Sequence, residues 1–362
     1  MADKQQIETA LKTYTDPYLG QDLITANAVK NINVEGNQAT IDIQFGYPTA
    51  GYNPTLIEAL TSCAKTVDGI ENVNVNIENK VVAHKVQQGV KAIEGVKNII
   101  AVASGKGGVG KSTTAVNLAL ALKAEGANVG LLDADIYGPS QPRMLGSNEK
   151  PQPAADGTHL NPVMAHGLQS MSIGYMIEEE TPMIWRGPMV TQALEQLLRD
   201  TLWNDLDYLV IDLPPGTGDT QLTLAQKIPV SGAVIVTTPQ DIALLDARKG
   251  LKMFEKVNIP VLGVVENMSI HICSKCGHEE HIFGEGGGQK MAEESGVDLL
   301  GSLPLDTSIR KNADGGHPTV IADNDSRIGE IYREIARGVG ARLSLKSKNY
   351  ATKFPTIKIE NK

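Results

Sequence analysis

Short apolar runs alternate with helix-like segments along most of the chain. Five of these runs consist largely of Val, Ile, Leu and Ala without polar alternation, which is typical of parallel strands buried on both faces. The segment after the first run, Ala115 to Ala124, has the Ala and Leu content of a helix. This alternation predicts an α/β domain with a mostly parallel sheet flanked by helices. The expected strands are residues 99–103, 129–133, 208–212, 232–237 and 260–266.

The first 80 residues have a different pattern, which predicts a separate small α+β domain. Apolar residues recur there at helical spacing in two stretches, and they alternate with polar residues in others. Cys63 falls on the apolar face of the second helical stretch, so we expect it in the core and not at a metal. The expected elements are a helix at residues 7–14, strands at residues 29–34 and 39–45, a helix at residues 56–67 and a strand at residues 73–77.

The remaining segments complete the expected organisation. Residues 81–97 are expected to form a connector helix, because Val86, Val90, Ile93 and Val96 fall near one helical face. Residues 98–340 would then be the α/β domain, with a loop or insertion at residues 151–167, which are rich in Pro, Ala and Asn. Residues 341–362 are polar and rich in Lys, and we expect a solvated tail without the apolar stripe of a membrane-binding helix.

Composition and charge narrow the classes of partner. Hydrophobic residues make up 41% of the 362 residues, which is enough for a true core. The formal net charge of -9 does not favour nucleic acid as a partner. The sequence has no apolar run long enough to span a membrane, and its polar start is unlike a signal peptide, so we expect a cytoplasmic protein without a membrane partner. Two of the three cysteines form a Cys-x-x-Cys pair.

A glycine-rich loop follows the first expected strand of the α/β domain and precedes its first helix. The loop fits the phosphate-binding pattern Gly-x-x-x-x-Gly-Lys-[Ser/Thr] with the sequence Gly105-Lys106-Gly107-Gly108-Val109-Gly110-Lys111-Ser112-Thr113. The glycines let backbone N–H groups converge on one anion, and the helix start adds partial positive charge. Lys111 would reach the terminal phosphates, and the Ser112 hydroxyl would bind Mg²⁺. A glycine-rich turn without a ligand would not explain why both the spacing and the flanks fit.

Polar side chains end the strands that should surround this loop. Asp133 and Asp135 follow one strand, and both could face a nucleotide because residues two apart in extended backbone point the same way. For one of these two, the alternative role of a helix or turn cap stays open. Asp212 ends another strand after largely apolar residues, as in a Walker B site that holds magnesium, and residues 214–219 after it suit a switch that senses the γ-phosphate. Asn267 follows a further strand, as a strand-end cap or a partner for a purine edge.

A Cys-x-x-Cys pair, Cys273 and Cys276, lies beyond the last expected strand. Two thiolates three residues apart can hold one metal centre, but a zinc site or an iron–sulfur cubane usually needs four ligands. A second chain could supply another pair of thiolates. Alternatively, His278 and His281 could complete a zinc knuckle within one chain. A redox dithiol is a third alternative, although such a motif usually begins a helix in a thioredoxin-like domain.

Lys106 adds a second lysine just after the first glycine of the loop. This variant resembles the deviant P-loop ATPases, the class of nitrogenase iron protein, cell-division positioning ATPases and plasmid-partition ATPases. The resemblance implies that Lys106 crosses a dimer interface to the partner's nucleotide, where a charge supplied in trans accelerates phosphoryl transfer by roughly a thousandfold or more. It also implies that Asp135 orients the attacking water and that Asp133 supports hydrated magnesium. In such relatives the positions of Asn267 and Asp306 border the adenine.

Several motifs together resemble the Mrp/ApbC family of iron–sulfur cluster carrier ATPases over about residues 95 to 340. The resemblance implies a homodimer with ATP and Mg²⁺ at the subunit interface and a labile [4Fe-4S] cluster bridged by Cys273 and Cys276 of both subunits. It implies apo iron–sulfur proteins and cluster-assembly factors as partners. The motifs are residues 105–113, 137–140, 185–189, 212–219 and 273–288.

The N-terminal 80 residues resemble the small domain of cytosolic iron–sulfur assembly factors. Asn53 stands where that domain often has a Cys, so a docking or adaptor role is expected and not metal binding. The whole sequence then predicts a cytosolic ATPase that holds an iron–sulfur cluster transiently and transfers it to apo-proteins. ATP binding or hydrolysis would shift the dimer geometry and so the exposure of the cluster.

Two other functions are compatible with the same sequence. One is a positioning or partition ATPase that associates with membrane or nucleoid, since these proteins share the deviant phosphate loop. The other is an ATPase whose Cys pair holds a structural zinc ion. Lipid or DNA binding would distinguish the first, and metal content with visible absorbance would distinguish the second.

Overall fold

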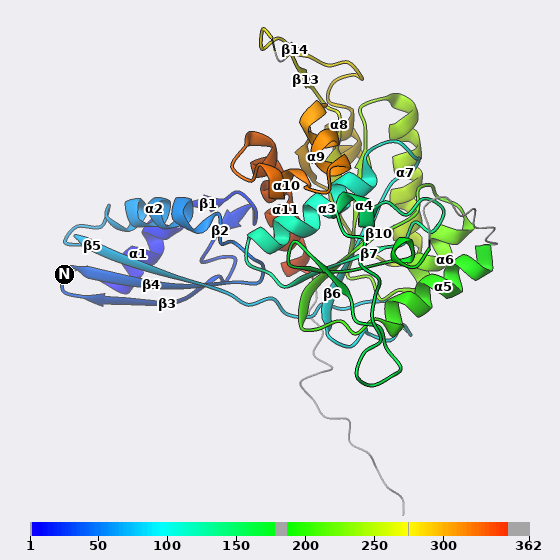
Figure 1. The fold of residues 1–362 in the computed structure, drawn as a ribbon. Coiled ribbons are helices and arrows are strands. Elements are labelled where there is room, and N and C mark those ends of the chain that lie inside the picture. The colour runs from blue at the N-terminus through cyan, green and yellow to red at the C-terminus, as the bar shows by residue number, and fades with distance from the viewer. Residues whose placement is uncertain (1, 88, 178–186, 274, 347–362) are drawn as a thin grey trace, which may run out of the picture.

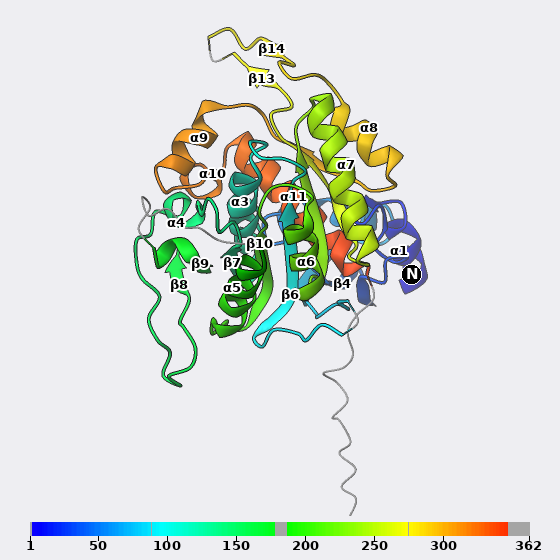
Figure 2. The ribbon, with the colours of Figure 1, turned by 90° about the vertical axis from the view of Figure 1, so that its right-hand side faces the viewer.

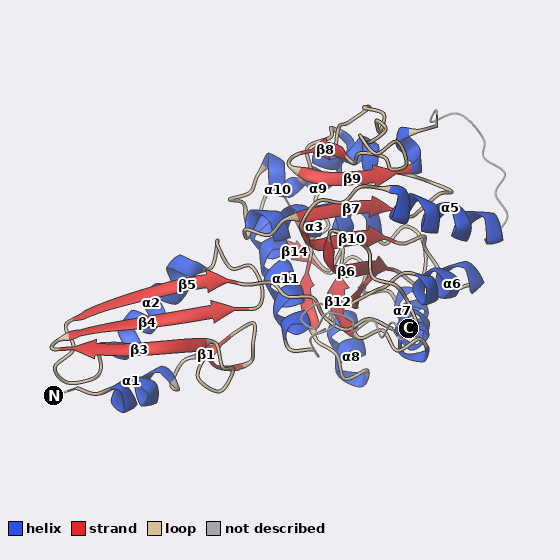
Figure 3. Cartoon of the chain, turned by 90° about the horizontal axis from the view of Figure 1, so that it is seen from below, coloured by secondary structure: helices blue, strands red, loops and turns tan. Residues whose placement is uncertain are grey.

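The computed structural model describes residues 2–87, 89–177, 187–273 and 275–346. A small N-terminal domain lies beside a larger α/β domain (Figure 1). Viewed from below, the three-stranded sheet of the first domain and the larger sheet of the second are both seen with helices packed along them (Figure 3). The expected α/β class and the preceding α+β unit are thus both confirmed.

The α/β domain is built on an eight-stranded sheet with the strand order β15-β12-β11-β6-β10-β7-β9-β8. Adjacent strands are parallel except β8 and β9, which are antiparallel. The carboxyl ends of parallel strands meet at one edge of the sheet, where ligands of open α/β sheets bind. The strands are β6 (Val96–Ala103), β7 (Val129–Asp133), β8 (Val163–Ala165), β9 (Leu168–Ser172), β10 (Leu206–Asp212), β11 (Gly232–Thr237), β12 (Val261–Glu266) and β15 (Leu299–Ser302), with a separate small hairpin of β13 (His271–Ile272) and β14 (Glu279–Glu280).

Five strands of this sheet match the expected ones, and β8, β9 and β15 are additions. β8 lies inside residues 151–167, so the expectation of a loop is wrong for residues 163–165. β8 and β9 form a short hairpin whose turn places His166 and Gly167 at φ of 49° and 74°. A three-residue strand is too short for a readable alternation of apolar and polar residues, which is why the sequence pattern does not reveal it.

Helices cover both faces of the large sheet (Figure 2). α3 and α11 share one apolar core with the sheet, and α5, α6, α7 and α8 share the other. Within β6, Ile99 and Ala101 belong to the second core, whereas Ile100 and Val102 belong to the first, as the two-residue period of a strand requires. The helices are α3 (Lys111–Ala124), α4 (Gln141–Met144), the 3-10 turn η1 (Ile173–Tyr175), α5 (Gly187–Asp200), α6 (Asp219–Lys227), α7 (Asp241–Lys256), α8 (Gly287–Glu294), α9 (Thr307–Asp314), α10 (Thr319–Ala322) and α11 (Arg327–Ser344).

None of the helices in the described part of the chain has the length and apolar character needed to cross a membrane.

The N-terminal domain packs two helices against a three-stranded sheet with the order β3-β4-β5. β3 and β4 are antiparallel, and β5 is parallel to β4. Alternate residues of β4, among them Ile41, Ile43 and Phe45, are buried in the core of this domain. Cys63 packs against the edge of that core, as expected. The elements are α1 (Lys4–Leu11), β1 (Thr15–Asp16), β2 (Gln21–Asp22), β3 (Val29–Glu35), β4 (Gln38–Phe45), α2 (Asn53–Ala64) and β5 (Asn72–Asn79).

The expected connector helix at residues 81–97 is wrong, because the described residues between β5 and β6 contain no helix. Gly89 and Gly95 have φ of 83° and 75°, in the left-handed region that interrupts a helix. The Asn98 side chain at the start of the sheet holds the segment instead, since its Oδ1 accepts the His84 backbone N–H at 3.0 Å. A tertiary hydrogen bond and two glycines therefore outweigh the helical spacing of the valines.

The start expected for the polar tail at residues 341–362 is wrong, because the structure is helical up to Ser344. α11 continues into this range, and Ala341 is fully buried in the core of the N-terminal domain. The preceding residue, Gly340, lies against the same domain: a Cβ there would be 2.9 Å from the Cβ of Tyr47. The last helix thus belongs to both cores, which no local pattern could indicate. Residues 347–362, where the rest of the tail expectation falls, lie outside the described residues.

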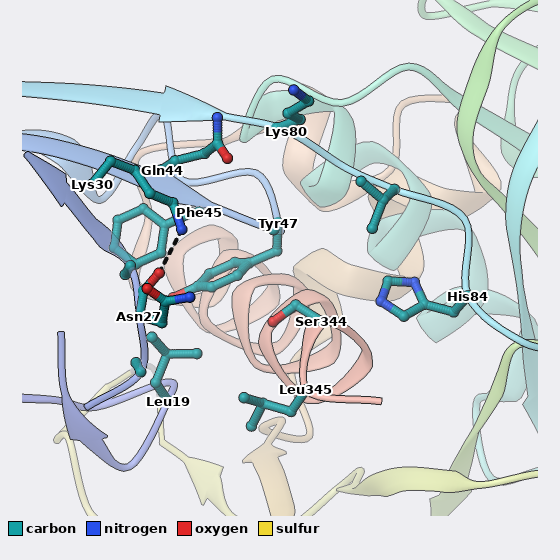
Figure 4. A pocket seen from close by; sticks show the side chains of 14 residues that line it. Leu19, Asn27, Lys30, Gln44, Phe45, Tyr47, Lys80, His84, Ser344 and Leu345 are labelled. Carbon is teal, nitrogen blue, oxygen red and sulfur yellow. Dashed lines mark hydrogen bonds between the residues drawn. The ribbon is translucent and has the colours of Figure 1, made fainter. Parts of the chain in front are cut away.

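A cavity of about 330 Å³ lies where the N-terminal domain meets the end of α11 (Figure 4). Tyr47 lines it from the N-terminal domain, and Ser344 and Leu345 line it from α11. On another wall, Lys30 Nζ donates to the Asn27 carbonyl at 2.6 Å. The end of α11 therefore forms part of a shared boundary between the two domains.

Candidate functional site

The glycine loop lies between the carboxyl end of β6 and the start of α3. Gly110 is the N-cap of α3, with φ of 81°, a backbone conformation that glycine adopts readily. Gly105 allows α7 to approach closely, since a Cβ there would lie 2.2 Å from the Asp246 carbonyl carbon. At Gly107 and Gly108 a Cβ would meet no heavy atom of the described residues within 4 Å, so this side of the loop is open. The loop thus has room for a phosphate beside the positive end of α3.

Lys111 and Asp212 form a buried ion pair at the base of the loop. The Lys111 Nζ donates to the Asp212 Oδ1 and, at 3.1 Å, to the Ser112 Oγ. The Lys111 side chain is 6% exposed and that of Asp212 is fully buried. Buried charges need partners, so each side chain fixes the other in place. The structure therefore brings together three of the residues expected at the phosphates and the metal.

Asp133 is fully buried at the end of β7, directly opposite Asp212 on the paired strand β10. Burial, and then the charge of Asp212, raise the pKa of Asp133 to about 7. The carboxylate organises the loop that follows β7, as the cap alternative expected, and its role toward hydrated magnesium stays a prediction. The donors to this carboxylate are the backbone N–H groups of Asp135 (3.1 Å), Ser140 (3.0 Å) and Gln141 (3.1 Å) and the Ser172 hydroxyl (3.0 Å).

Gln141, the first residue of α4, is a site residue that the sequence does not reveal. Its side chain is almost fully buried, and its Nε2 donates to the Asp212 Oδ2 at 2.9 Å and to the Ser112 carbonyl at 3.1 Å. Its backbone N–H donates to Asp133, so one residue contacts the glycine loop, β7 and β10. The motif that ends at Ser140 stops one residue short of it. A glutamine at the start of a short helix carries no sequence signal for such a role.

Asp135 is half-buried near the same ion pair. Burial raises its pKa, the charge of Lys111 lowers it, and the charge of Asp212 raises it, so this carboxyl lies within reach of both partners. Its expected role toward the attacking water stays a prediction.

Lys106 is half-buried at the front of the glycine loop. The Ser104 hydroxyl donates to its carbonyl at 2.9 Å, which holds the backbone. Lys106 takes part in none of the ion pairs of the described residues. Its charge is thus uncommitted within this part of the chain, which is compatible with the expected contact to a partner's nucleotide.

Asn267, directly after β12, contacts the glycine loop. Its Nδ2 donates to the Val109 carbonyl at 2.9 Å, and its Oδ1 accepts the Met268 N–H at 2.9 Å. A Cβ on Gly110 would lie 2.1 Å from the same Nδ2, so this packing requires glycine there. In this structure Asn267 acts as a strand-end cap, and its contact with adenine stays a prediction.

Asp306 is the N-cap of α9. Its Oδ1 accepts the backbone N–H of Ser308 at 2.7 Å and the Ser308 hydroxyl at 2.6 Å. The preceding residue, Leu305, donates its N–H to the Ile270 carbonyl at 2.7 Å and accepts from His271 Nδ1 at 3.1 Å. The loop that carries Asp306 therefore lies at the base of the Cys hairpin, and its expected contact with adenine stays a prediction.

Cys273 and Cys276 lie in the turn between β13 and β14, a hairpin that projects from the α/β domain (Figures 1 and 2). The Cys273 N–H donates to the His278 carbonyl at 2.9 Å, and the Gly277 N–H donates back to the Cys273 carbonyl at 2.8 Å. Hydrogen bonds from the backbone N–H groups of Lys275 and Cys276, and then from the Cys276 thiol, lower the pKa of Cys273. A lowered pKa favours the thiolate, the form that binds metals.

The described residues contain no group of three or more His, Cys, Asp or Glu side chains placed to hold one metal ion. His281 Nδ1 instead donates to the Ser269 carbonyl at 3.0 Å, and its Nε2 lies 3.7 Å from the Glu285 carboxylate. The zinc knuckle within one chain is therefore not assembled in this structure. The Cys pair supplies two ligands, so a centre with four ligands would need two more from beyond the Cys hairpin as it is arranged here.

The hairpin is anchored to the strand end that bears Asn267. The buried Glu266 carboxylate, the last residue of β12, accepts the Gly288 N–H at the start of α8, which follows the hairpin. On the other side, the Ser269 N–H donates to the Leu303 carbonyl at 3.0 Å. The segment that follows β12 therefore contacts the glycine loop through Asn267 and the end of the Cys hairpin through Ser269, whose carbonyl accepts from His281 Nδ1.

The polar groups around Lys111 fit a nucleotide with Mg²⁺. Gln141 Oε1 and Ser140 Oγ are buried and have no hydrogen-bond partner among the described residues. Orphaned buried oxygens of this kind are satisfied in native proteins by water or ligands. The Ser112 hydroxyl and the Asp212 carboxylate provide hard oxygen ligands of the type that Mg²⁺ prefers. The donor set is thus suited to a hydrated magnesium ion on a phosphate.

Two known families match this chain. The family described as NUBPL iron-transfer P-loop NTPase matches residues 95–340. The family described as iron-sulfur cluster assembly protein matches residues 4–77. The two matches together cover most of both domains.

Individual relatives agree with the family matches. The iron-sulfur cluster carrier protein of Pseudomonas fragi is 61% identical over 285 residues, which cover 78% of this chain and 99% of the relative. That of Salmonella typhimurium is 51% identical over 340 residues, which cover 94% of this chain and 92% of the relative. A nucleotide-binding protein of Archaeoglobus fulgidus, solved in complex with ADP, is 35% identical with a TM-score of 0.56 and covers 66% of this chain and 92% of that chain. The expected family is confirmed: this chain belongs to the iron–sulfur cluster carriers of the NUBPL-type P-loop NTPase family.

Proposed function

We propose that this chain is an ATP-hydrolysing carrier that holds a labile [4Fe-4S] cluster between two copies of itself and transfers it to apo-proteins. One observation carries the proposal: the segment that follows β12 contacts both the glycine loop, through Asn267, and the end of the Cys hairpin, through Ser269, whose carbonyl accepts from His281 Nδ1 at 3.0 Å. Asn267 and Ser269 are two residues apart, so the glycine loop and the end of the Cys hairpin are linked through one short segment. The relatives described above are iron–sulfur cluster carrier proteins, which supports an iron–sulfur cluster as the cargo.

The proposed homodimer follows from the number of ligands. One chain supplies two thiolates, Cys273 and Cys276, whereas a cubane cluster usually takes four. A two-fold axis beside the hairpin would bring the same pair from a second copy to the cluster. Ile272 and Ile282 lie on either side of the pair with exposed fractions of 46% and 49%, so a partner's hairpin would cover apolar surface.

ATP with Mg²⁺ is the proposed ligand of the glycine loop. Lys111 would exchange its partner Asp212 for the terminal phosphates, and Ser112 and Asp212 would hold the metal. Bound magnesium supplies positive charge against the charge that develops on the transferred phosphoryl group. Asp135 orients the attacking water, and Lys106 reaches the partner's nucleotide. The remaining residues proposed at the nucleotide are Asp133, toward the hydrated metal, and Asn267 and Asp306, beside the adenine.

We also propose the partners and the cellular setting from the same features. Apo iron–sulfur proteins and cluster-assembly factors are the proposed recipients and donors. Residues 1–80 serve as an adaptor domain, and the ATPase domain extends from about residue 98 to the end of α11. The net charge of -9 does not favour a nucleic-acid partner, and we place the protein in the cytoplasm without a membrane partner as part of this proposal.

Anaerobic reconstitution with iron and sulfide tests the proposed cluster site. The wild-type protein should gain visible absorbance and about four iron atoms per dimer, as expected for one cubane. The double variant Cys273→Ser, Cys276→Ser should gain neither, yet bind nucleotide as the wild type does. Cys63→Ser, which removes the remaining cysteine from the N-terminal core, is the matched control and should retain the cluster. A double variant that kept the cluster, or a monomer with full iron content, would refute the site.

Metal analysis of anaerobically purified protein separates the two remaining alternatives. Stoichiometric zinc without visible absorbance would refute the iron–sulfur cluster and favour a structural zinc site at the Cys pair. Cosedimentation with lipid vesicles or DNA in the presence of ATP should be negative, and a positive result would favour a positioning ATPase.

A further inference from the structure

The Gln141 side chain has one satisfied end and one unsatisfied end. Its Nε2 donates both of its hydrogens, to the Asp212 Oδ2 and to the Ser112 carbonyl. Its Oε1 is buried and accepts no hydrogen bond from the described residues. The amide orientation follows from its partners, because a flipped amide would place Oε1 against a carboxylate and a carbonyl, neither of which can donate.

A buried amide oxygen without a donor is rare, because leaving it unpaired costs free energy that folding does not recover. The Lys111 Nζ, which shares the Asp212 carboxylate with Gln141, is already engaged by the Asp212 Oδ1 and the Ser112 Oγ. Both of those partners are residues expected at the metal. A ligand that binds beside Ser112 and Asp212 would therefore supply the missing donor to Gln141.

We propose that Gln141 is a positioning residue for magnesium, whose Nε2 orients the Asp212 carboxylate and whose Oε1 accepts a hydrogen bond from a water on the metal. Protein-bound Mg²⁺ keeps several of its waters, and each of them can donate to an oxygen. Residues that orient metal ligands in this way contribute to metal affinity without touching the metal. The proposal rests on the magnesium–nucleotide site proposed above and assigns a residue to it.

The hydrogen bond from Gln141 also explains how the buried Asp212 carboxylate can lose its ion pair with Lys111. When Lys111 turns to a phosphate, the buried carboxylate of Asp212 loses its cation but keeps the Gln141 Nε2 donor at 2.9 Å. The Gln141 backbone N–H holds the Asp133 carboxylate at 3.1 Å. The loop from β7 to α4, which carries Asp135, is therefore tied through the same residue to Ser112 and Asp212, which would hold the metal.

Nucleotide binding at a series of Mg²⁺ concentrations tests this role without relying on turnover. The probe is a fluorescent ADP analogue, titrated in EDTA and then with increasing Mg²⁺. Gln141→Met removes both the donor and the acceptor at similar length, and Gln141→Asn keeps the amide but shortens its reach. Gln169→Met is the matched control: Gln169 on β9 also uses both amide ends, with Asn204 as its partner at 2.8 and 2.9 Å, away from the glycine loop.

We expect the Mg²⁺ concentration for half-maximal tightening to rise about tenfold or more in Gln141→Met. Affinity in EDTA should stay at the wild-type value, and the control should match the wild type in both conditions. An unchanged Mg²⁺ requirement, or an equal loss of affinity in EDTA, would overturn the proposal, since a merely structural residue would behave so.

Circular dichroism checks folding in the same samples. If Gln141→Met does not fold, Gln141→Asn decides: a raised Mg²⁺ requirement supports the positioning role, and a wild-type requirement overturns it. If the wild-type protein shows no Mg²⁺-dependent binding of the probe, the magnesium–nucleotide site fails and this proposal falls with it. A change confined to the Gln141 variants therefore separates this inference from the proposed function.

Discussion

The Arg337 Nη2 donates to the Glu125 Oε1 at 2.8 Å, in an ion pair whose two side chains are 4% and 0% exposed. Glu125 directly follows α3, the helix that begins at the glycine loop, and Arg337 lies on α11. The Glu125 Oε2 also accepts the Gly51 N–H at 2.8 Å, and the Arg337 Nη1 donates to the Tyr18 hydroxyl at 2.8 Å. One buried ion pair thus joins α3, α11 and the N-terminal domain.

Arg337→Met should destabilise the protein strongly, because it leaves the buried Glu125 carboxylate without its cation. Removing one partner of a buried pair costs about 3–5 kcal/mol. Denaturant unfolding measures the loss. Arg310→Met is the matched control, because Arg310 pairs with Asp314 at the surface at 2.9 Å, and exposed pairs contribute about 0–1 kcal/mol. Equal effects of the two variants would show that the buried pair does not carry the domain contact.

Asp133 should make the stability of the metal-free protein fall as pH rises. An unfolded aspartate releases its proton near pH 4, whereas folded Asp133 holds its proton up to about pH 7. The folded state therefore binds more protons between these values, and the free energy of unfolding declines with rising pH in that window and levels off above it. Asp133→Asn lacks this proton. Unfolding of both proteins in EDTA over a pH series is the measurement, and parallel curves would contradict the assignment.

Lys106→Ala should lower ATP hydrolysis by about a thousandfold while nucleotide still binds, because a charge supplied in trans acts on the transition state. Asp135→Ala should also be inactive, since the attacking water loses its orienting group. In a mixture of the two, each heterodimer has one intact composite site. Random pairing should then restore about a quarter of the wild-type rate, as half the dimers are mixed and one of their two sites is whole. A mixture without activity would place Lys106 in its own subunit's site.

Lys111→Met should lose nucleotide binding and also stability, because Asp212 would stay buried without its cation. The loss in the free energy of unfolding is expected at about 3–5 kcal/mol. Adding Asp212→Asn removes the orphaned charge, so the double variant should be more stable than the single one without regaining nucleotide affinity. Thermal unfolding and nucleotide titration on the same samples separate the two effects. A double variant less stable than Lys111→Met would mean that the pair is not coupled.

The α/β architecture was readable from sequence because buried parallel strands are continuous apolar runs. β7 and β11 match the expected strands residue for residue. Strand β8 carries no strand pattern because it is three residues long and lies at the edge of the sheet, and β9 lacks the continuous apolar run of the other strands, since its sequence LQSMS includes buried Ser170 and Ser172. At residues 81–97 the sequence predicted a helix that the structure does not contain. The apolar residues there have helical spacing, but Gly89 and Gly95 adopt positive φ, and the hydrogen bond from the His84 N–H to Asn98 holds the segment in a non-helical conformation.

The sequence by itself determined the kind of chemistry: the glycine loop, the strand-end carboxylates and the Cys pair are local patterns whose spacing follows from backbone geometry. Only the tertiary structure decided which distant residues share an environment. It placed Gln141 between Ser112 and Asp212, and it buried Arg337 against Glu125. It also directed backbone N–H groups of the loop after β7 to the Asp133 carboxylate. Such contacts form where strands and helices from distant parts of the sequence meet, and the spacing of residues along the chain does not indicate where they meet.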